Sequence, residues 1–482
     1  ADARLIAAEM NGLDFDLRIL RPWSRDPSYY ATVFADQSDV PAHEGPSAEV
    51  LDLFAYDWPL SKPDAERLTV RMEAVPILLN RARSNLSGGN AADFWAYGTR
   101  AFEQQTATLD ALLEGSLELR SLTGTRTASL EGASGIVDAD LRQSVLNARD
   151  ASAEFGRWIA TQAPGKTGPS GMGKEQFNWY MKNVQLVPYD WDEQVSLFRR
   201  ELERSWSMLA MEEHRNRDLP PLEPIENPEE YRAFAKSSMQ TFVDFVIDNG
   251  FIEDKPIYRQ ALETQTLDYI APEDRNFFYH VTARDPLPLY SHFVHWVELA
   301  RLAEEPSPDP IRQAPSLFNI YAARSEGYAT AFEEIALNGG LYEDRPRARE
   351  LVWIMLANRA ARGLASLYVQ ANELDLERAG QLHSRWTPRG WSDVGNPLVG
   401  FEQLLYLRQP GYGTSYITGK LLLDRLIAER RMEANGAERA FDLVEIFREL
   451  DDGIMPWPLM MEEPEWLMTG QHQGLVSLDP AE

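Results

Sequence analysis

Two histidines and a downstream glutamate have the residue types and spacing that could do chemistry. His292 and His295 lie in the run P-L-P-L-Y-S-H-F-V-H-W-V-E-L-A-R-L, and Glu326 opens the block E-G-Y-A-T-A-F-E-E. On one predicted helix the two imidazoles would diverge by about 60° and could lean toward one point with the Glu326 carboxylate. This set could bind zinc and leave a position for water, or it could perform acid/base chemistry without a metal.

The spacing of the histidines leaves these interpretations open. H-x-x-H suits zinc less well than the i, i+4 spacing of an H-E-x-x-H helix. His292 also falls on an apolar stripe with Leu289 and Trp296, which is typical of a helix face turned to the core. A pair of buried, hydrogen-bonded core histidines is therefore the structural alternative.

Carboxylates and guanidinium groups accompany the histidines. Glu326 and Glu333 are seven residues apart and share a helix face, so joint burial would raise their pKa values and yield a general acid or base. Glu334 is expected on a solvated acidic face. Arg359 and Arg362 could clamp a carboxylate or a phenolate, although pairing with structural acids is the more common use of such arginines.

Composition limits the classes of function. The chain has 482 residues, of which 44% are hydrophobic and 25% charged, so it folds around large cores. Its net charge of −28 excludes nucleic acid and anionic lipid as expected partners, and no run of about 18 apolar residues predicts a membrane span. The lack of cysteine excludes disulfides, thiolate zinc sites and cysteine nucleophiles. The opening Ala-Asp-Ala suggests a processed, periplasmic or secreted protein.

Hydrophobic periodicity predicts a mainly α-helical fold with little β-structure. Helical patterns over 63–80, 92–115 and 141–161 predict an N-terminal helical layer spanning residues 1–162. A loop rich in Gly, Pro and Ser at 163–173 marks the boundary to a catalytic region, 163–482. Within that region the pattern predicts a long amphipathic helix over 189–214 and a strand over 277–282. The two regions are expected to form one compact unit.

Four sequence blocks carry a resemblance to a known family. They are G-K-E-Q-F-N-W-Y from Gly173, E-G-Y-A-T-A-F-E-E from Glu326, R-A-A-R at 359–362, and P-G-Y-G-T-S-Y-I-T-G at 410–419. In this order they resemble the bacterial domain of unknown function 885 proteins, which are similar to helical zincin metallopeptidases. The resemblance covers roughly residues 165–460 and implies a large helical zincin-like fold. It also implies that Tyr416 faces the catalytic centre, where a phenol can donate to a developing oxyanion.

The chain departs from the family's metal-binding pattern. Glu298 stands where the first zinc histidine is expected, and Ser366 and Gln370 replace an Asp and a His, whereas the carboxylate Glu326 is retained. The resemblance therefore supports the scaffold more strongly than the peptidase chemistry.

Three functions follow as hypotheses. The first is an exported lyase without a cofactor, in which His292, His295, Glu326 and Tyr416 cleave a small aromatic molecule by acid/base chemistry. The second is a zinc-dependent hydrolase that uses His292, His295 and Glu326 as ligands, and the third is an inactive binding protein. A homo-oligomer is compatible with all three. The residues expected to contact the substrate are His280, Tyr290, Trp296, Tyr328, Arg359, Arg362, Tyr412 and Tyr180, with Asp285 available to orient a histidine.

Overall fold

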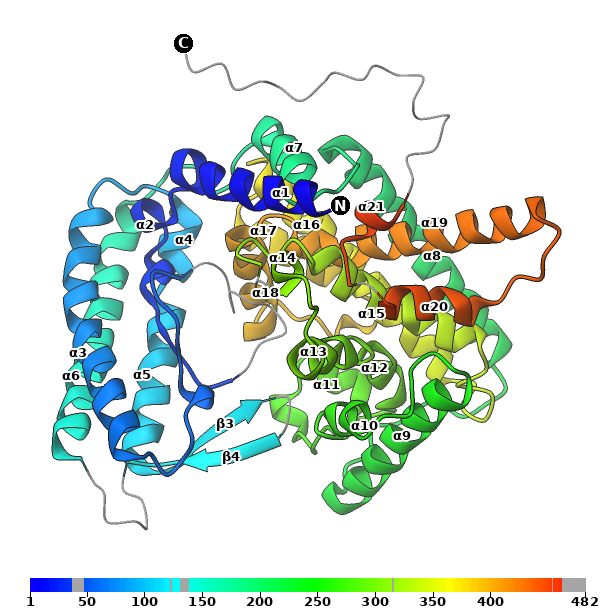
Figure 1. The fold of residues 1–482 in the computed structure, drawn as a ribbon, viewed down its shortest axis with the longest axis horizontal. Helices are drawn as coiled ribbons and strands as arrows, with labels where there is room; N and C mark the ends of the chain where they lie inside the picture. The colour runs from blue at the N-terminus through cyan, green and yellow to red at the C-terminus, as the bar shows by residue number, and fades with distance from the viewer. Residues whose placement is uncertain (37–46, 122–123, 131–137, 314–315, 453, 462–482) are drawn as a thin grey trace.

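The computed structural model describes residues 1–36, 47–121, 124–130, 138–313, 316–452 and 454–461, and these are mainly helical (Figure 1). The strands among them are short: β1 (Val33–Phe34) pairs in parallel with β2 (Leu51–Asp52), and β3 (Leu117–Ser121) pairs antiparallel with β4 (Gly124–Ala128). The prediction of a mainly α-helical fold with little β-structure is confirmed. No helix in the described part of the chain is long and apolar enough to cross a membrane.

Three long helices form the N-terminal layer, at the left of Figure 1: α3 (Lys62–Asn85), α5 (Thr99–Glu114) and α6 (Ala139–Gln162). Their apolar faces bury a hydrophobic core of their own, which includes Leu68, Phe102, Leu109 and Phe155. The side chains of Ser61 and Asp138 accept backbone N–H groups and cap the first turns of α3 and α6. The helix expected at 92–115 is divided at Gly98, where the short α4 (Ala92–Tyr97) ends and α5 begins.

A second, larger core surrounds α16 (Ala348–Gln370), which is buried along nearly its whole length. The long helix α8 (Trp191–Arg215) packs along it, close to the predicted bounds of 189–214. It begins with a capping box, in which Asp190 and Glu193 each accept an N–H from the other's backbone. The helices α15 (Ala322–Asn338) and α19 (Tyr412–Gly436) pack against each other and against α16.

Glycines let the backbones of α15 and α19 touch. A Cβ atom at Gly327 would lie 2.3 Å from the Cα of Gly419, and one at Gly419 would lie 1.8 Å from the Ala323 carbonyl oxygen. Only residues without a side chain fit at this crossing. The close approach brings the first turns of α19 within hydrogen-bonding reach of Glu326 on α15.

The helix predicted around the two histidines is two helices. α12 (Leu287–His292) ends at His292, and α13 (His295–Glu304) begins at His295, with Phe293 and Val294 forming a turn between them. The imidazoles are therefore placed by a helix end and a helix start, rather than by the pitch of one helix. The expected 60° divergence does not apply here.

The strand predicted at 277–282 is also helical, as α11 (Phe277–Thr282). The side chain of Asn276 accepts the N–H of Tyr279 and caps this short helix, which is a start signal that outweighs the local β propensity. The strand prediction is wrong for this reason.

The segment 163–173 connects the two cores through hydrogen bonds. Gly168 exchanges backbone hydrogen bonds with Asn90 and Ala92, and Gly173 donates its N–H to the carbonyl of Gln370 at the end of α16. This segment is therefore held by both the N-terminal layer and the α16 region. The division of the chain into 1–162 and 163–482 stays a prediction.

Candidate active site

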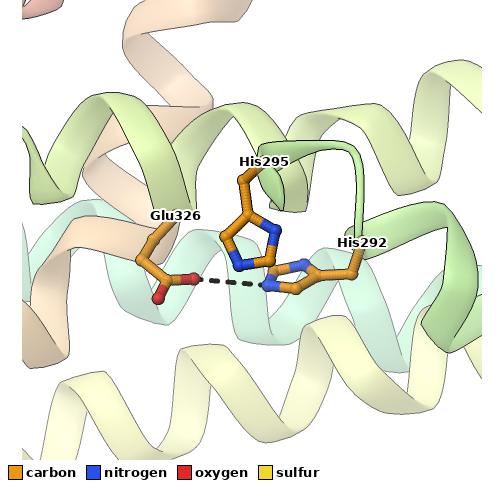
Figure 2. Close-up of side chains that lie close together, drawn as sticks. All are labelled: His292, His295 and Glu326. Carbon is orange, nitrogen blue, oxygen red and sulfur yellow. Dashed lines mark hydrogen bonds and ion pairs between the residues drawn. The ribbon is translucent and has the colours of Figure 1, made fainter. Parts of the chain in front are cut away.

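Three predicted residues meet at the ends of α12, α13 and α15. His292, His295 and Glu326 are all buried, and each offers one nitrogen or oxygen atom within 4.8 Å of the others. Figure 2 shows both imidazoles beside the Glu326 carboxylate, with the turn between the histidines arching over them. The ring centroids of the two histidines are 5.1 Å apart.

Both ring nitrogens of His292 have partners. Nε2 lies 3.2 Å from Glu326 Oε2, and Nδ1 lies 3.2 Å from Arg359 Nη2 and 3.0 Å from Glu333 Oε1. A neutral ring that donates from Nε2 to Glu326 can accept from Arg359 at Nδ1. Burial and the Arg359 guanidinium lower the pKa of His292 to about 3, against the opposing effect of the Glu333 carboxylate beside Nδ1.

The Glu326 carboxylate is held from its other side by a chain of two phenols from α19. The Tyr412 hydroxyl donates to Glu326 Oε1 over 2.5 Å, and the Tyr416 hydroxyl donates to the Tyr412 oxygen over 3.3 Å. The Tyr416 ring lies nearly parallel to His292, with 6.3 Å between the centroids. Glu326 is thus the shared acceptor of an imidazole and a phenol.

Two buried arginines from α16 flank this group. Arg359 forms a two-point ion pair with Glu333 at 2.7 and 2.9 Å, and Arg362 pairs with Glu402 of α18 (Pro397–Arg408). The Arg362 guanidinium carbon lies 4.4 Å from the centre of the Tyr416 ring. The arginines therefore already have carboxylate partners, as their structural interpretation predicted.

A cavity of about 600 Å³ opens onto these residues. Of the residues predicted from sequence, those that line it are His292, His295, Trp296, Glu326, Arg359, Arg362, Tyr412 and Tyr416. The rest of its wall is rich in aromatic rings, among them Phe278, Phe293 and Phe401. Such a concave, largely aromatic site with a few convergent polar groups is typical of a small-molecule pocket.

Four predicted substrate residues lie away from the cavity. His280 stacks on Trp391, and Tyr290 accepts the backbone N–H of Leu267 through its hydroxyl. Tyr328 packs in the main core, and Tyr180 is buried against Phe15. None of the four is among the described residues that line the cavity.

Asp285 likewise does not orient a histidine. Its carboxylate accepts from Arg345 Nη1 over 3.0 Å and from the backbone N–H of Leu287. Asp285 therefore stabilises the start of α12, the helix that ends at His292.

The positions where the chain departs from the family pattern make structural contacts. Glu298 accepts two hydrogen bonds from Arg324, at 3.0 and 2.7 Å. Ser366 donates to the Gly363 carbonyl, and Gln370 donates to the carbonyls of Tyr406 and Leu407. These side chains stabilise helix packing and do not line the cavity.

Sequence reasoning missed Glu402 and the N-terminal wall of the cavity. Glu402 is the one acidic residue in the apolar helix α18, a pattern that indicates a buried pair. Phe34, Gln104 and Thr108 of the N-terminal part also line the cavity. No local signal marks them, because they reach the site only through the packing of the two cores.

Comparisons with known proteins show the fold alone. No family model matches the chain, and no curated protein matches it. The resemblance to the domain of unknown function 885 proteins therefore stays a prediction. A solved structure of a candidate lipoprotein of unknown function from Shewanella oneidensis is similar over 94% of this chain and 87% of its own, with a TM-score of 0.61 and 14% identity. A candidate lipoprotein from Colwellia psychrerythraea is similar over 83% of this chain and 75% of its own, with a TM-score of 0.54 and 14% identity.

Proposed function

We propose that this protein is an enzyme that cleaves a small aromatic molecule by acid/base chemistry, as a lyase. One observation carries the proposal: an imidazole pair, a buried carboxylate and two linked phenols converge on one aromatic cavity. Lyase chemistry needs a positioned base, an acid and an oxyanion donor, and all three residue types are present.

The contacts support distinct roles for the two histidines. His292 is engaged through both ring nitrogens and has a low pKa, so it suits positioning of Glu326. We assign proton removal to His295, which also lines the cavity. As His295 takes a proton from the substrate, the released electron pair forms a double bond and the bond to the leaving group breaks. The leaving group departs with that bond's electrons and takes a proton from the Tyr416 hydroxyl.

A zinc-dependent hydrolase is the second candidate. His292, His295 and Glu326 would hold the ion, since their donor atoms lie within 4.8 Å of one another. Glu333 Oε1, at 3.0 Å from His292 Nδ1, has the position of an outer carboxylate that orients a metal-bound histidine. Bound zinc would activate water for attack on a peptide or amide. We rank this candidate second because Arg359 lies beside the same imidazole and would repel a dication.

We also propose that the protein is exported to the periplasm or secreted. The description of both structural neighbours as candidate lipoproteins supports this location. Fractionation of the source cells tests it: the protein is expected in the periplasmic or extracellular fraction, and its recovery with cytosolic markers would contradict export.

A substrate screen in the presence of a chelator tests the proposed reaction. Aromatic compounds with a hydroxyl or ether leaving group are incubated with the wild type, His295→Gln and Tyr416→Phe, and products are followed by mass spectrometry. We expect turnover that persists in the chelator and is lost in both variants. His214→Gln, on an exposed part of α8, is the control that keeps activity. Turnover that needs zinc would favour the hydrolase, and ligand binding without any turnover would favour an inactive binding protein.

A further inference from the structure

The buried lysine, arginine and carboxylate charges in the described part of the cavity lining are ion-paired, with one exception. Three arginines are among these described lining residues, and each has its own carboxylate: Arg359 pairs with Glu333, Arg362 with Glu402, and Arg408 with Asp26 at 2.7 Å. No lysine is among the lining residues that the structure describes. Among the described residues, no lysine or arginine lies within ion-pair distance of Glu326. Its hydrogen-bond partners are His292 and Tyr412, and the charge of Arg362 acts on it only from beyond that distance.

An unpaired buried carboxylate favours a cation in its neighbourhood. Removing an ionised carboxylate from water costs free energy that hydrogen bonds alone offset only in part. A positive group on the ligand would complete the pairing of Glu326. An anionic group would meet this carboxylate, whereas each guanidinium in the described lining already has a carboxylate partner.

The walls of the cavity near Glu326 suit the same type of group. Tyr412, Tyr416 and Trp296 present aromatic rings to the cavity, and aromatic faces attract ammonium groups. These rings strengthen the preference that Glu326 sets.

We infer that the substrate of this site is an aromatic molecule with a protonated amino group, and that Glu326 binds this group while carboxylate-bearing analogues are excluded. The inference rests on the proposed function and names its substrate class. In that scheme Glu326 anchors the substrate, and His295 and Tyr416 exchange protons with it.

Equilibrium binding of three matched compounds tests the inference. 2-Phenylethylamine, 2-phenylethanol and phenylacetate have similar rings and differ in charge, and their binding to the full-length protein is measured by calorimetry. We expect the amine to bind at least about tenfold more tightly than the alcohol, the gain expected of a close charge pair in a buried site, and phenylacetate to bind most weakly. The order of the three affinities on wild-type protein tests the inference even if a variant fails to fold.

Two variants locate the effect. Glu326→Gln should lower the affinity for the amine to that for the alcohol. Glu334→Gln, which changes a carboxylate of the same helix that is held by Arg204 and Lys420, should leave the order unchanged. Tightest binding of phenylacetate, equal affinities, or no binding by any of the three would overturn the inference. One divalent ion per chain that is lost in Glu326→Gln would also overturn it, because the metal would then be the missing cation.

The outcomes separate this inference from the proposed function. Preferential binding of the amine with no turnover of any amine would count against the lyase reaction alone. Turnover of a carboxylate-bearing compound would count against the charge preference alone.

Discussion

Two sides of α15 carry similar charged residues in different surroundings. On one side, the paired side, Arg324 binds the Glu298 carboxylate of α13 and the carbonyls of Leu450 and Met455. On the other, the site side, Glu326 and Glu333 face His292, and Glu326 also borders the cavity.

The difference shows what distinguishes a site from a structural ion pair in this molecule. Buried charge is common to both sides of α15, so burial alone does not indicate function. On the paired side the Glu298 carboxylate meets a cation in close packing. On the site side Glu326 has no lysine or arginine within ion-pair distance among the described residues, and it adjoins open volume, which is the condition that a ligand can satisfy.

The largest expected effect is on turnover, from a change on the site side. In His295→Gln we expect activity to fall by about 10²- to 10⁴-fold, because the proposed base is removed. Steady-state kinetics measure this loss, and thermal unfolding monitors the fold. A rise in KM alone, with kcat retained, would show that His295 binds substrate without moving a proton.

A change on the paired side should act on stability instead. Glu298→Ala leaves the Arg324 guanidinium buried without its carboxylate, so the free energy of unfolding should fall by about 3–5 kcal/mol. Urea denaturation measures the change. If Glu298→Ala spared stability but abolished ligand binding, the two sides of α15 would not differ as described.

The crossing of α15 with α19 supplies a third test. Gly419→Ala places a methyl group against the Ala323 carbonyl, and the required backbone shift should cost about 1–3 kcal/mol. It should also weaken ligand binding, because Tyr412 and Tyr416 move away from Glu326. Gly436→Ala, at the open end of the same helix, has no neighbour to displace and should be neutral or slightly stabilising.

The smallest expected effect is a dependence of the free energy of unfolding on pH. Burial and the nearby Arg362 lower the pKa of His383 to about 3, below the value of about 6.5 in an unfolded chain. The unfolded state therefore binds more protons between pH 6.5 and 3, and the free energy of unfolding should fall as the pH decreases through this range. The contribution is full above pH 6.5, and its slope reaches about 1.4 kcal/mol per pH unit.

His383→Gln should reduce that slope. Urea midpoints at pH 7, 6 and 5 measure it for the wild type and the variant, with the exposed His214→Gln as a control. If the variant and the wild type had the same slope, the pKa of His383 would not be lowered in the folded protein.

Much of the scaffold follows from local sequence signals. The periodicity of 63–80 and 189–214 predicts most of α3 and α8, and Ser61 and Asp190 have the residue types expected of their N-terminal caps. The meeting of His292, His295 and Glu326 was also predictable from their motifs. The break at 293–294 was not, because its sequence carries no Gly or Pro and the turn is set by tertiary packing.

The walls and charge balance of the site depend on long-range packing. Phe34 and Thr108 reach the cavity from the other core, and the pairing of Arg362 with Glu402 joins residues 40 positions apart. Glu326 can be recognised as the carboxylate without a lysine or arginine partner only when all these pairs are assigned, and this assignment requires the three-dimensional structure.

Metal analysis of the native protein tests the chemistry most directly. Protein prepared with zinc available and without chelators is analysed by plasma mass spectrometry. A metal-free acid/base site predicts far less than one divalent ion per chain, unchanged in His295→Gln and Glu326→Gln. One zinc per chain that is lost in both variants would contradict it and establish a metal centre in its place.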